Sequence, residues 1–486
     1  MIGAVSGAPS GSRELPINHL GLALALLRRS LSAAELAALG AVLAGAAALR
    51  IVGSASGLPL PLLNPDETNI VPRAWEVVHG GGLDPGWYDY PSLIFLALAP
   101  TQIGLDEPSY GAARVVAVVV GIAGVAAAWW LGRVAYGTAA ALTGAVGVAV
   151  ATTGVAYSRM AVTDVFLALG VTVTLALLVS GRLEWAGVAA GLAASAKYPG
   201  VILVVPIVVA GLGAWRRVGV AVGIAFAAFL LTSPFVVIHA GAAWDDFHRV
   251  QELARDGWLG FEDDPATPFA FALRLWETLG PLVLVAAAGI VVALRRRERA
   301  DLILLSFGAA YALSLLASHA HFDRYVLPLV PVLAVLAGRG RTLAIAALVA
   351  AVVPLWWSIE DARSLTGRDP RLDAAAWIDR TIPTTDTIAA DPSTLPLTGR
   401  RVERLALPGP GRRFDRRRSL DALRGDGVRW LVVGGGVTDR VLAAADRYPR
   451  ETRFYRSLER LSPAYATPSE PGRRPRPWLR VYRIYP

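Results

Sequence analysis

Eleven apolar stretches occupy most of the first 357 residues and restrict what this chain can fold into. A membrane-spanning helix needs about 20 mostly apolar residues, and the longer stretches reach that length. Only 17% of the residues are charged, whereas soluble proteins have roughly a quarter, so much of the surface is expected to face lipid. We therefore predict a polytopic α-helical membrane protein with about eleven transmembrane helices. The stretches are residues 33–52, 112–131, 139–156, 162–179, 185–196, 199–212, 218–238, 279–294, 302–317, 326–336 and 343–357.

The charges between these stretches set the predicted orientation. Arginines gather in alternate connections, for example at Arg133, Arg182 and residues 295–299, whereas two long connections, about 53–110 and 239–278, hold most of the acids. Because short cytoplasmic connections are enriched in Lys and Arg, this pattern places the N-terminus inside and both long loops outside. The alternation requires residues 185–212 to form two spans, and one long broken helix is the alternative.

The pattern predicts that the chain has three parts: a cytoplasmic N-terminal leader (1–32), a transmembrane catalytic domain (33–357) and an extracytoplasmic domain (358–486). In the last part, a helix at 373–379 and strands at 387–390, 428–433 and 479–484 indicate a small α/β domain. The glycine triplet 434–436 lacks the spacing of a phosphate loop, so we expect an ordinary loop. The net charge of +9 lies in this part and suits a solvated face or anionic lipid headgroups, with no nucleic-acid motif beside it.

Two adjacent carboxylates, Asp66 and Glu67, follow the first stretch closely. A carboxylate near the membrane surface suits a general base, because a like-charged neighbour and partial burial raise its pKa. The alternative is an ordinary N-cap for a helix over residues 68–78. Aromatic and acidic side chains nearby are candidates for substrate contact, since sugar rings pack on aromatic faces while their hydroxyls reach carboxylates. These candidates are Trp75, Asp84, Tyr88, Asp89 and Tyr90.

Lys197 is the single Lys of the chain and interrupts apolar sequence. An ionisable group there is expensive and indicates function, and a compact ammonium can hold a phosphate. The alternative is that it reaches out to the headgroups. Arg324 is the second candidate for the phosphate, and Tyr198 and Tyr325 adjoin the two cations. Asp164 is a further candidate, with a structural salt bridge to Arg159 as the alternative.

Five motifs in order resemble the GT-C membrane glycosyltransferases, in the branch of the protein O-mannosyltransferases and the lipid A aminoarabinose transferase. They are Asp66-Glu67 with Tyr90-Pro91-Ser92, then residues 158–164, 194–200, 323–331, and 369–371 with 376–378. The resemblance covers nearly the whole chain and implies a polyprenyl-phosphate sugar as donor, with Asp66 as base and Glu67 beside it in the site. One departure is Tyr90-Pro91-Ser92, where many members carry His-Pro-Pro.

These observations predict an inverting glycosyltransferase that acts on a glycan, lipid or protein acceptor at the outer face of the cell membrane. In this hypothesis Asp66 deprotonates the acceptor, Lys197 and Arg324 stabilise the leaving phosphate, and the loop 239–278 excludes water. That loop offers Trp244, Asp245, Asp246 and His248 for acceptor contact. A transporter or flippase of a lipid-linked or anionic solute is the alternative. No cofactor is predicted, and His319, His321 and Asp323 give only a weak metal pattern that leaves a divalent cation open.

Overall fold

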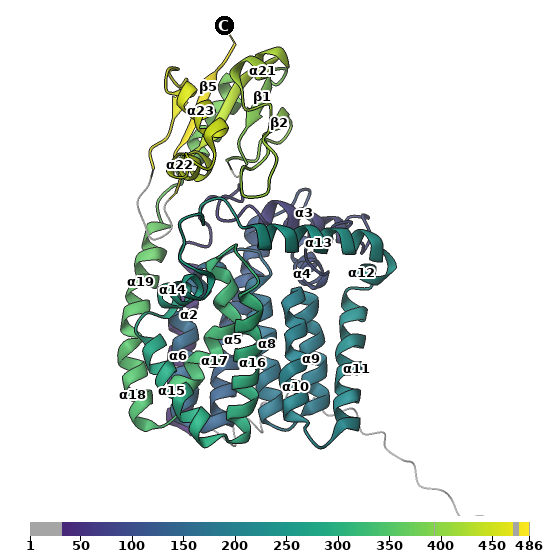
Figure 1. Cartoon of the computed structure of the whole chain (residues 1–486), viewed down its shortest axis with the longest axis vertical. Coiled ribbons are helices and arrows are strands. Elements are labelled where there is room, and N and C mark those ends of the chain that lie inside the picture. The colour runs from purple at the N-terminus through teal and green to yellow at the C-terminus, as the bar shows by residue number, and fades with distance from the viewer. Residues whose placement is uncertain (1–31, 393, 470–475, 486) are drawn as a thin grey trace, which may run out of the picture.

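The computed structural model describes residues 32–392, 394–469 and 476–485. The predicted leader, apart from Ser32, lies outside these residues. Figure 1 shows a bundle of roughly parallel helices, a layer of short helices across one end of it, and a mixed sheet with helices beyond that layer. The layer between bundle and sheet is formed by the two long connections, 53–110 and 239–278. Each of these connections therefore contains helices rather than irregular chain alone.

Helices account for most of the chain up to residue 364. They are α2 (Ala33–Ile51), α3 (Glu67–Val78), α4 (Leu93–Leu98), η1 (Ala99–Gln102), α5 (Tyr110–Tyr136), α6 (Thr138–Val150), α7 (Thr152–Tyr157), α8 (Asp164–Val179), α9 (Leu183–Ala196), η2 (Tyr198–Leu203), α10 (Val204–Ala210), α11 (Trp215–Thr232), α12 (Phe235–Ile238), α13 (Ala240–Asp256), α14 (Thr267–Leu279), α15 (Leu282–Arg296), α16 (Arg299–Leu315), η3 (Asp323–Leu329), α17 (Val330–Ala337), α18 (Arg341–Ala350) and α19 (Val352–Ser364).

Each of the eleven apolar stretches is helical over most of its length, which confirms the prediction of helices there. In the described part of the chain, four helices are long and apolar enough to cross a membrane: α2, α5, α11 and the continuous helix Arg341–Ser364. Helices α14 and α15 give a fifth if they count as one span bent by 113°. The other apolar helices are shorter because the chain breaks them, as at Ala151 between α6 and α7.

The chain reverses direction at Lys197. Gly200, just after the break, lies so close to the end of α9 that an added Cβ would be 2.4 Å from the backbone nitrogen of Ala194. Gly211, after α10, packs against Leu183 at the start of α9. Residues 183–210 therefore form two antiparallel helical legs joined at Lys197, with glycine permitting the close approach.

The break in α6 is stabilised by a buried arginine. The last carbonyls of a helix have no partner within it and need donors from elsewhere. Arg50, which is 1% exposed, donates to the carbonyls of Val148 and Ala149 at 3.0 Å each. The hydroxyl of Ser358 donates to the carbonyl of Val150 at 2.9 Å. These side chains supply the missing donors where α6 ends.

A five-stranded mixed sheet forms the core of the C-terminal part, in the order β2-β1-β3-β5-β4. Strands β1 (Thr387–Ala390), β2 (Arg401–Arg404) and β3 (Val428–Gly434) are parallel, and β5 (Leu479–Arg483) is antiparallel to β3 and β4 (Tyr465–Ala466). Helices α20 (Pro370–Thr381), α21 (Leu420–Gly425), α22 (Gly435–Ala443) and α23 (Pro449–Leu458) accompany the sheet. The three predicted strands and the predicted helix are confirmed. The expected glycine loop is wrong, because β3 ends at Gly434 and α22 begins at Gly435.

Candidate active site

Asp66 lies at the start of α3, where two side chains from distant segments reach its carboxylate. The guanidinium of Arg324 donates to Oδ2 at 2.8 Å, and the hydroxyl of Tyr90 donates to the same oxygen at 3.1 Å. The backbone N–H of Asp66 donates to the side chain of Asn64 at 2.9 Å, which fixes the turn before the helix. The Asp66 side chain makes no capping bond to α3, so the alternative of an ordinary N-cap is wrong for this residue.

Lys197 lies over the ring of Tyr90, the residue whose hydroxyl reaches Asp66. Its ammonium binds Oδ1 of Asp164 at 2.6 Å and lies 5.7 Å from the ring centroid of Tyr90 and 5.2 Å from that of Tyr325. We call Asp66, Tyr90, Asp164, Lys197, Arg324 and Tyr325 the charged cluster. Its two cations and two carboxylates come from the loop before α3, the start of α8, the break after α9 and the start of η3.

The charged cluster keeps hydrogen-bonding capacity for a ligand. Oδ2 of Asp164 and Nε of Arg324 are buried, and neither has a hydrogen-bond partner among the described residues. Buried polar groups are normally hydrogen-bonded, so such atoms need an explanation. A bound anion would give the Arg324 Nε–H an acceptor, and a substrate hydroxyl would give the Asp164 oxygen a donor.

Glu67 points away from Asp66 into a buried ion pair. Arg114 of α5 donates to both carboxylate oxygens, at 2.8 and 2.7 Å, and the backbone N–H of Ala161 donates to one of them at 2.9 Å. Glu67 is 0% exposed, and Arg114 also donates to the carbonyls of Ser54 and Ser56. This carboxylate therefore ties α3 to α5 and to the turn before α8, while its neighbour remains partly exposed.

Asp84, Tyr88 and Asp89 join the first long connection to α13. The backbone N–H of Tyr88 donates to Asp246 at 2.8 Å, and Arg249 pairs with both Asp89 and Asp246. The hydroxyl of Tyr88 donates to Asp84, which also lies 3.1 Å from the ring of His239, and the hydroxyl of Tyr198 donates to the carbonyl of Tyr88. Burial raises the pKa of Asp89, partly offset by the charge of Arg249.

Three more residues predicted to contact substrate make contacts outside the charged cluster. The indole of Trp75 donates to the carbonyl of Leu105 at 2.8 Å and stacks on His79. Arg159 is buried and pairs with Asp361 of α19 at 2.6 Å. From α13, Trp244 is exposed and stacks near Phe247.

The weak metal pattern around His319 does not come together as one group. His319 contacts the carbonyl of Arg255, His321 lies 3.1 Å from Asp264, and Asp323 accepts from the hydroxyl of Tyr157 at 2.9 Å. In the described residues, no three His, Cys, Asp or Glu side chains gather as they do around a metal ion.

Two residues near the site were missed from the sequence. Arg249 bridges the two long connections, and its spacing from Asp246, three residues apart on a helix, was an available signal. Tyr157 reaches Asp323, next to Arg324, from a segment 166 residues away, and nothing in its local sequence indicates this contact.

A groove lies between the first long connection and the C-terminal part. Its volume is about 380 Å³, and Pro65 and Thr68, on either side of Asp66, contribute to its wall. The opposite wall comes from the segment after β1, including Leu395 and Leu397, together with Arg404 of β2.

Comparisons with known proteins bear on this arrangement. Residues 87–318 match the model of glycosyltransferase family 87, a range that includes Lys197 and ends before Arg324. No curated protein matches the sequence. Among solved structures, the chain is similar to ArnT from Cupriavidus metallidurans in the apo state, with 15% identity and a TM-score of 0.60 over 92% of this chain and 98% of that one.

Two further structures, both with lipid phosphates, are similar. ArnT from Cupriavidus metallidurans bound to undecaprenyl phosphate has 14% identity and a TM-score of 0.58 over 91% of this chain and 98% of that one. The archaeal oligosaccharyltransferase AglB from Archaeoglobus fulgidus, in complex with an inhibitory peptide and a dolichol-phosphate, has 13% identity and a TM-score of 0.60 over 89% and 73%. At these identities the likeness shows the fold.

The resemblance to GT-C enzymes inferred from sequence motifs is thereby confirmed at the level of the fold. The family match adds the class of activity, which fold alone does not give. The chain is a multi-pass membrane glycosyltransferase with the GT-C fold, and its central part, residues 87–318, matches glycosyltransferase family 87.

Proposed function

We propose that this enzyme transfers a sugar from a polyprenyl-phosphate-linked donor to a hydroxyl of a glycan, lipid or protein acceptor. The observation that carries the proposal is the charged cluster, in which Asp66 binds Arg324 and Tyr90 while Lys197 lies over the Tyr90 ring. Two solved structures of the same fold contain undecaprenyl phosphate or dolichol-phosphate, which supports this donor class. The family match supports transfer over transport.

The donor phosphate is assigned to Lys197 and Arg324, with Tyr198 and Tyr325 beside them. In the structure, both cations are paired with carboxylates, Lys197 with Asp164 and Arg324 with Asp66. A phosphate that approaches Arg324 competes with Asp66 for the guanidinium. Charge-assisted bonds to phosphate are strong, and the same cations stabilise the charge that develops when the lipid phosphate leaves. Donor binding therefore loosens Asp66 from its ion pair.

Asp66 is then the general base of an inverting displacement. Its carboxylate takes the proton of the acceptor hydroxyl, whose oxygen forms a bond to the anomeric carbon from the face opposite the phosphate. The bond between that carbon and the phosphate oxygen breaks, and polyprenyl phosphate leaves with the electron pair. A base must lie within hydrogen-bond reach of the proton it takes, and the partial exposure of Asp66 allows this.

The remaining predicted site residues take supporting roles in this proposal. Glu67 and Arg159 anchor the segments that carry Asp66 and Asp164, through Arg114 and Asp361. Asp84, Tyr88 and Asp89 hold α13 over the site, where this helix helps exclude water. The acceptor approaches through the groove of about 380 Å³ beside Pro65.

We further propose eleven spans, with the N-terminus inside and both the active site and residues 358–486 outside. Figure 1 shows α3, α4 and α13 at the same end of the bundle as the sheet. At other helix ends, Arg133 pairs with Glu35 at the start of α2, and Arg299 donates to the last carbonyl of α10. The Arg-rich connections lie at the end of the bundle away from the sheet. Because cytoplasmic connections are enriched in Arg, this supports a cytoplasmic location for that end. Residues 33–357 then form the membrane domain.

The test uses purified enzyme with undecaprenyl-phosphate hexoses and pentoses, or with nucleotide sugars, and an extract of cell-envelope acceptors. We expect transfer only from the lipid-linked donors, with release of undecaprenyl phosphate. Transfer from a nucleotide sugar would contradict the proposal. Movement of the intact lipid-linked sugar across a vesicle membrane, without transfer, would instead support a flippase.

A further inference from the structure

Residues 257–264, between α13 and α14, connect the C-terminal sheet to the segment that carries Arg324. We call residues 257–264 the bridging segment. Resting on the function proposed above, we propose that the bridging segment positions Arg324 for the donor phosphate, with His321 and Phe322 as positioning residues. The C-terminal part thus acts on the donor site through Arg324.

One end of the bridging segment is built into the C-terminal part. Leu259 is 1% exposed and packs in the same apolar core as Val441 and Tyr448. Glu262 accepts from the hydroxyl of Tyr448 at 2.6 Å, and its backbone carbonyl accepts from Arg447 at 2.7 Å. Burial, and then the hydrogen bond to Glu262, raise the pKa of Tyr448, so its hydroxyl stays a donor.

The chain between these contacts is shaped for close packing. Gly260 has φ +96°, a left-handed conformation that favours glycine, and an added Cβ would lie 2.8 Å from the side chain of Arg440. The Gly260 N–H donates to the carboxylate of Glu262 at 2.6 Å. The guanidinium of Arg412 lies 4.3 Å from the ring centroid of Trp258. The segment is therefore held on several sides.

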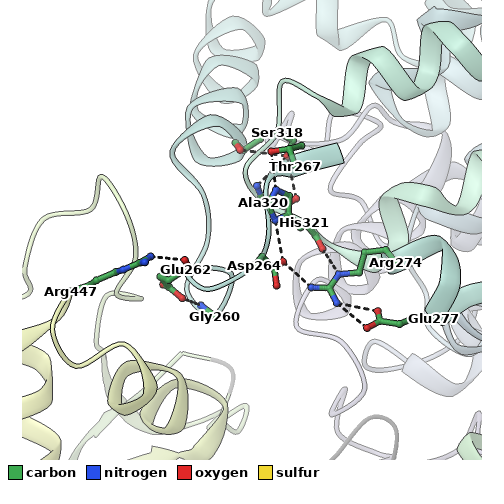
Figure 2. Close-up of polar contacts among 11 residues, drawn as sticks. Gly260, Glu262, Asp264, Thr267, Arg274, Glu277, Ser318, Ala320, His321 and Arg447 are labelled. Carbon is green, nitrogen blue, oxygen red and sulfur yellow. Dashed lines mark hydrogen bonds and ion pairs between the residues drawn. The ribbon is translucent and has the colours of Figure 1, made fainter. Parts of the chain in front are cut away.

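The other end is held by a polar network around His321, shown in Figure 2. Asp264 accepts from Arg274 at 2.9 Å and lies 3.1 Å from Nδ1 of His321. Nε2 of the same ring lies 3.2 Å from the hydroxyl of Thr267, and Arg274 donates to the carbonyl of His321 at 3.0 Å. Both ring nitrogens and the carbonyl of His321 are thus engaged, and the side chain is buried.

Aromatic contacts link the bridging segment and the His321 network to the charged cluster. The ring of Phe322 lies 5.5 Å from Trp258, 5.1 Å from Phe261 and 5.5 Å from Tyr325. The guanidinium of Arg324 lies 4.9 Å from the centroid of Phe322 and binds Asp66. Only one residue separates Phe322 from Arg324, so a shift of the bridging segment moves the cation that faces the phosphate.

The test is a double-mutant cycle on the affinity for undecaprenyl phosphate. Glu262→Ala removes the acceptor of the Tyr448 hydroxyl, and Arg324→Met removes the cation. Perturbations along a contact network change coupling by roughly 2- to 30-fold, so Glu262→Ala should weaken binding by that factor in the wild-type background. In the Arg324→Met background it should add no further loss, because the positioned group is gone.

Matched controls separate positioning from a loss of folding. Asp263→Ala removes the neighbouring carboxylate, which is 81% exposed and 3.7 Å from Arg447, and should leave binding unchanged. Tyr448→Phe deletes only the hydroxyl that donates to Glu262 and keeps the bond from the Gly260 N–H, so it should weaken binding in the same direction as Glu262→Ala, by no more than that variant, with the thermal unfolding midpoint retained. His321→Ala should weaken binding, and His321→Asn, with a donor placed like Nδ1, should restore it.

The outcomes are distinct. Unchanged binding in Arg324→Met overturns the proposed role of Arg324 at the phosphate. Weaker binding in Arg324→Met, combined with no effect of Tyr448→Phe or with additive losses in the cycle, overturns the positioning role and leaves the proposed function intact.

Discussion

Replacement of Asp66 by Asn should separate catalysis from donor binding. The Asn side chain keeps the size of Asp and can still accept a hydrogen bond from Arg324, but it cannot take a proton from the acceptor. A general base contributes roughly a hundredfold to ten-thousandfold in rate, so turnover should fall by that factor. Because Asp66 makes no capping bond to α3, the substitution should leave the helix intact, and because the pair with Arg324 is partly exposed, the loss of its charge should destabilise the protein less than the loss of the buried Glu67 charge.

The same substitution should tighten the binding of undecaprenyl phosphate. Asp66 and Arg324 are 27% and 14% exposed, so solvent screens their interaction only in part. A hydrogen bond to a charged group contributes about 1.5–3 kcal/mol, and a phosphate no longer competes with that carboxylate for Arg324. From the lower end of this range, the affinity should rise about tenfold.

Both quantities are measurable on one preparation, as sugar transfer from an undecaprenyl-phosphate donor and as calorimetric binding of undecaprenyl phosphate. Asp106→Asn, an exposed carboxylate change in the same long connection, serves as the control and should alter neither quantity. Full turnover in Asp66→Asn would show that another group is the base. Weaker lipid-phosphate binding would show that Asp66 assists the phosphate rather than competing with it.

Three further predictions concern the donor site, the anchor and the topology. Lys197→Met should weaken undecaprenyl phosphate binding by about 2–5 kcal/mol, measured by calorimetry, and unchanged affinity would make Lys197 a membrane anchor. Glu67→Gln should destabilise the protein by about 3–5 kcal/mol because it leaves Arg114 buried without its counter-charge. Glu184→Gln, in an exposed pair, should shift the thermal unfolding midpoint much less, and equal shifts would refute the anchoring role. In this Cys-free chain, Asp421→Cys (96% exposed as Asp) should react with an impermeant thiol reagent in intact cells and Arg296→Cys should not, and equal reaction would refute the proposed topology.

The helices of the bundle could be predicted from the sequence because burial in lipid demands long apolar stretches, which are a local signal. Strand β2 was missed because Arg401–Arg404 is a largely exposed edge strand without apolar alternation. The helix start at Gly435 was missed because glycine normally indicates a turn, whereas here an added Cβ would meet Trp478 at about 2.7 Å.

The partners of the charged residues could not be predicted in the same way. Asp66 and Arg324 are 258 residues apart, and Glu67 and Arg114 are 47 apart. The sequence indicated that each charged residue near the membrane needs a partner of opposite charge. Which of several possible residues becomes that partner depends on how the helices pack. Lys197 could be singled out from the sequence, because burying a charge is costly and a lone Lys within apolar sequence therefore indicates a special position.

The adjacency of Asp66 and Glu67 has a physical explanation in their unequal surroundings. Glu67 is 0% exposed and receives donors from Arg114 and Ala161, so the first turn of α3 is held from α5 and from the segment before α8. The backbone of Asp66, one residue earlier, is therefore also fixed, and its N–H donates to Asn64. The side chain of Asp66 is held only by the Arg324 guanidinium and the Tyr90 hydroxyl. A carboxylate that exchanges its partner for a proton must be placed accurately and bound weakly, and these demands conflict in a single residue. In the proposed mechanism, two neighbouring carboxylates divide them, with Glu67 fixing the backbone and Asp66 free to react.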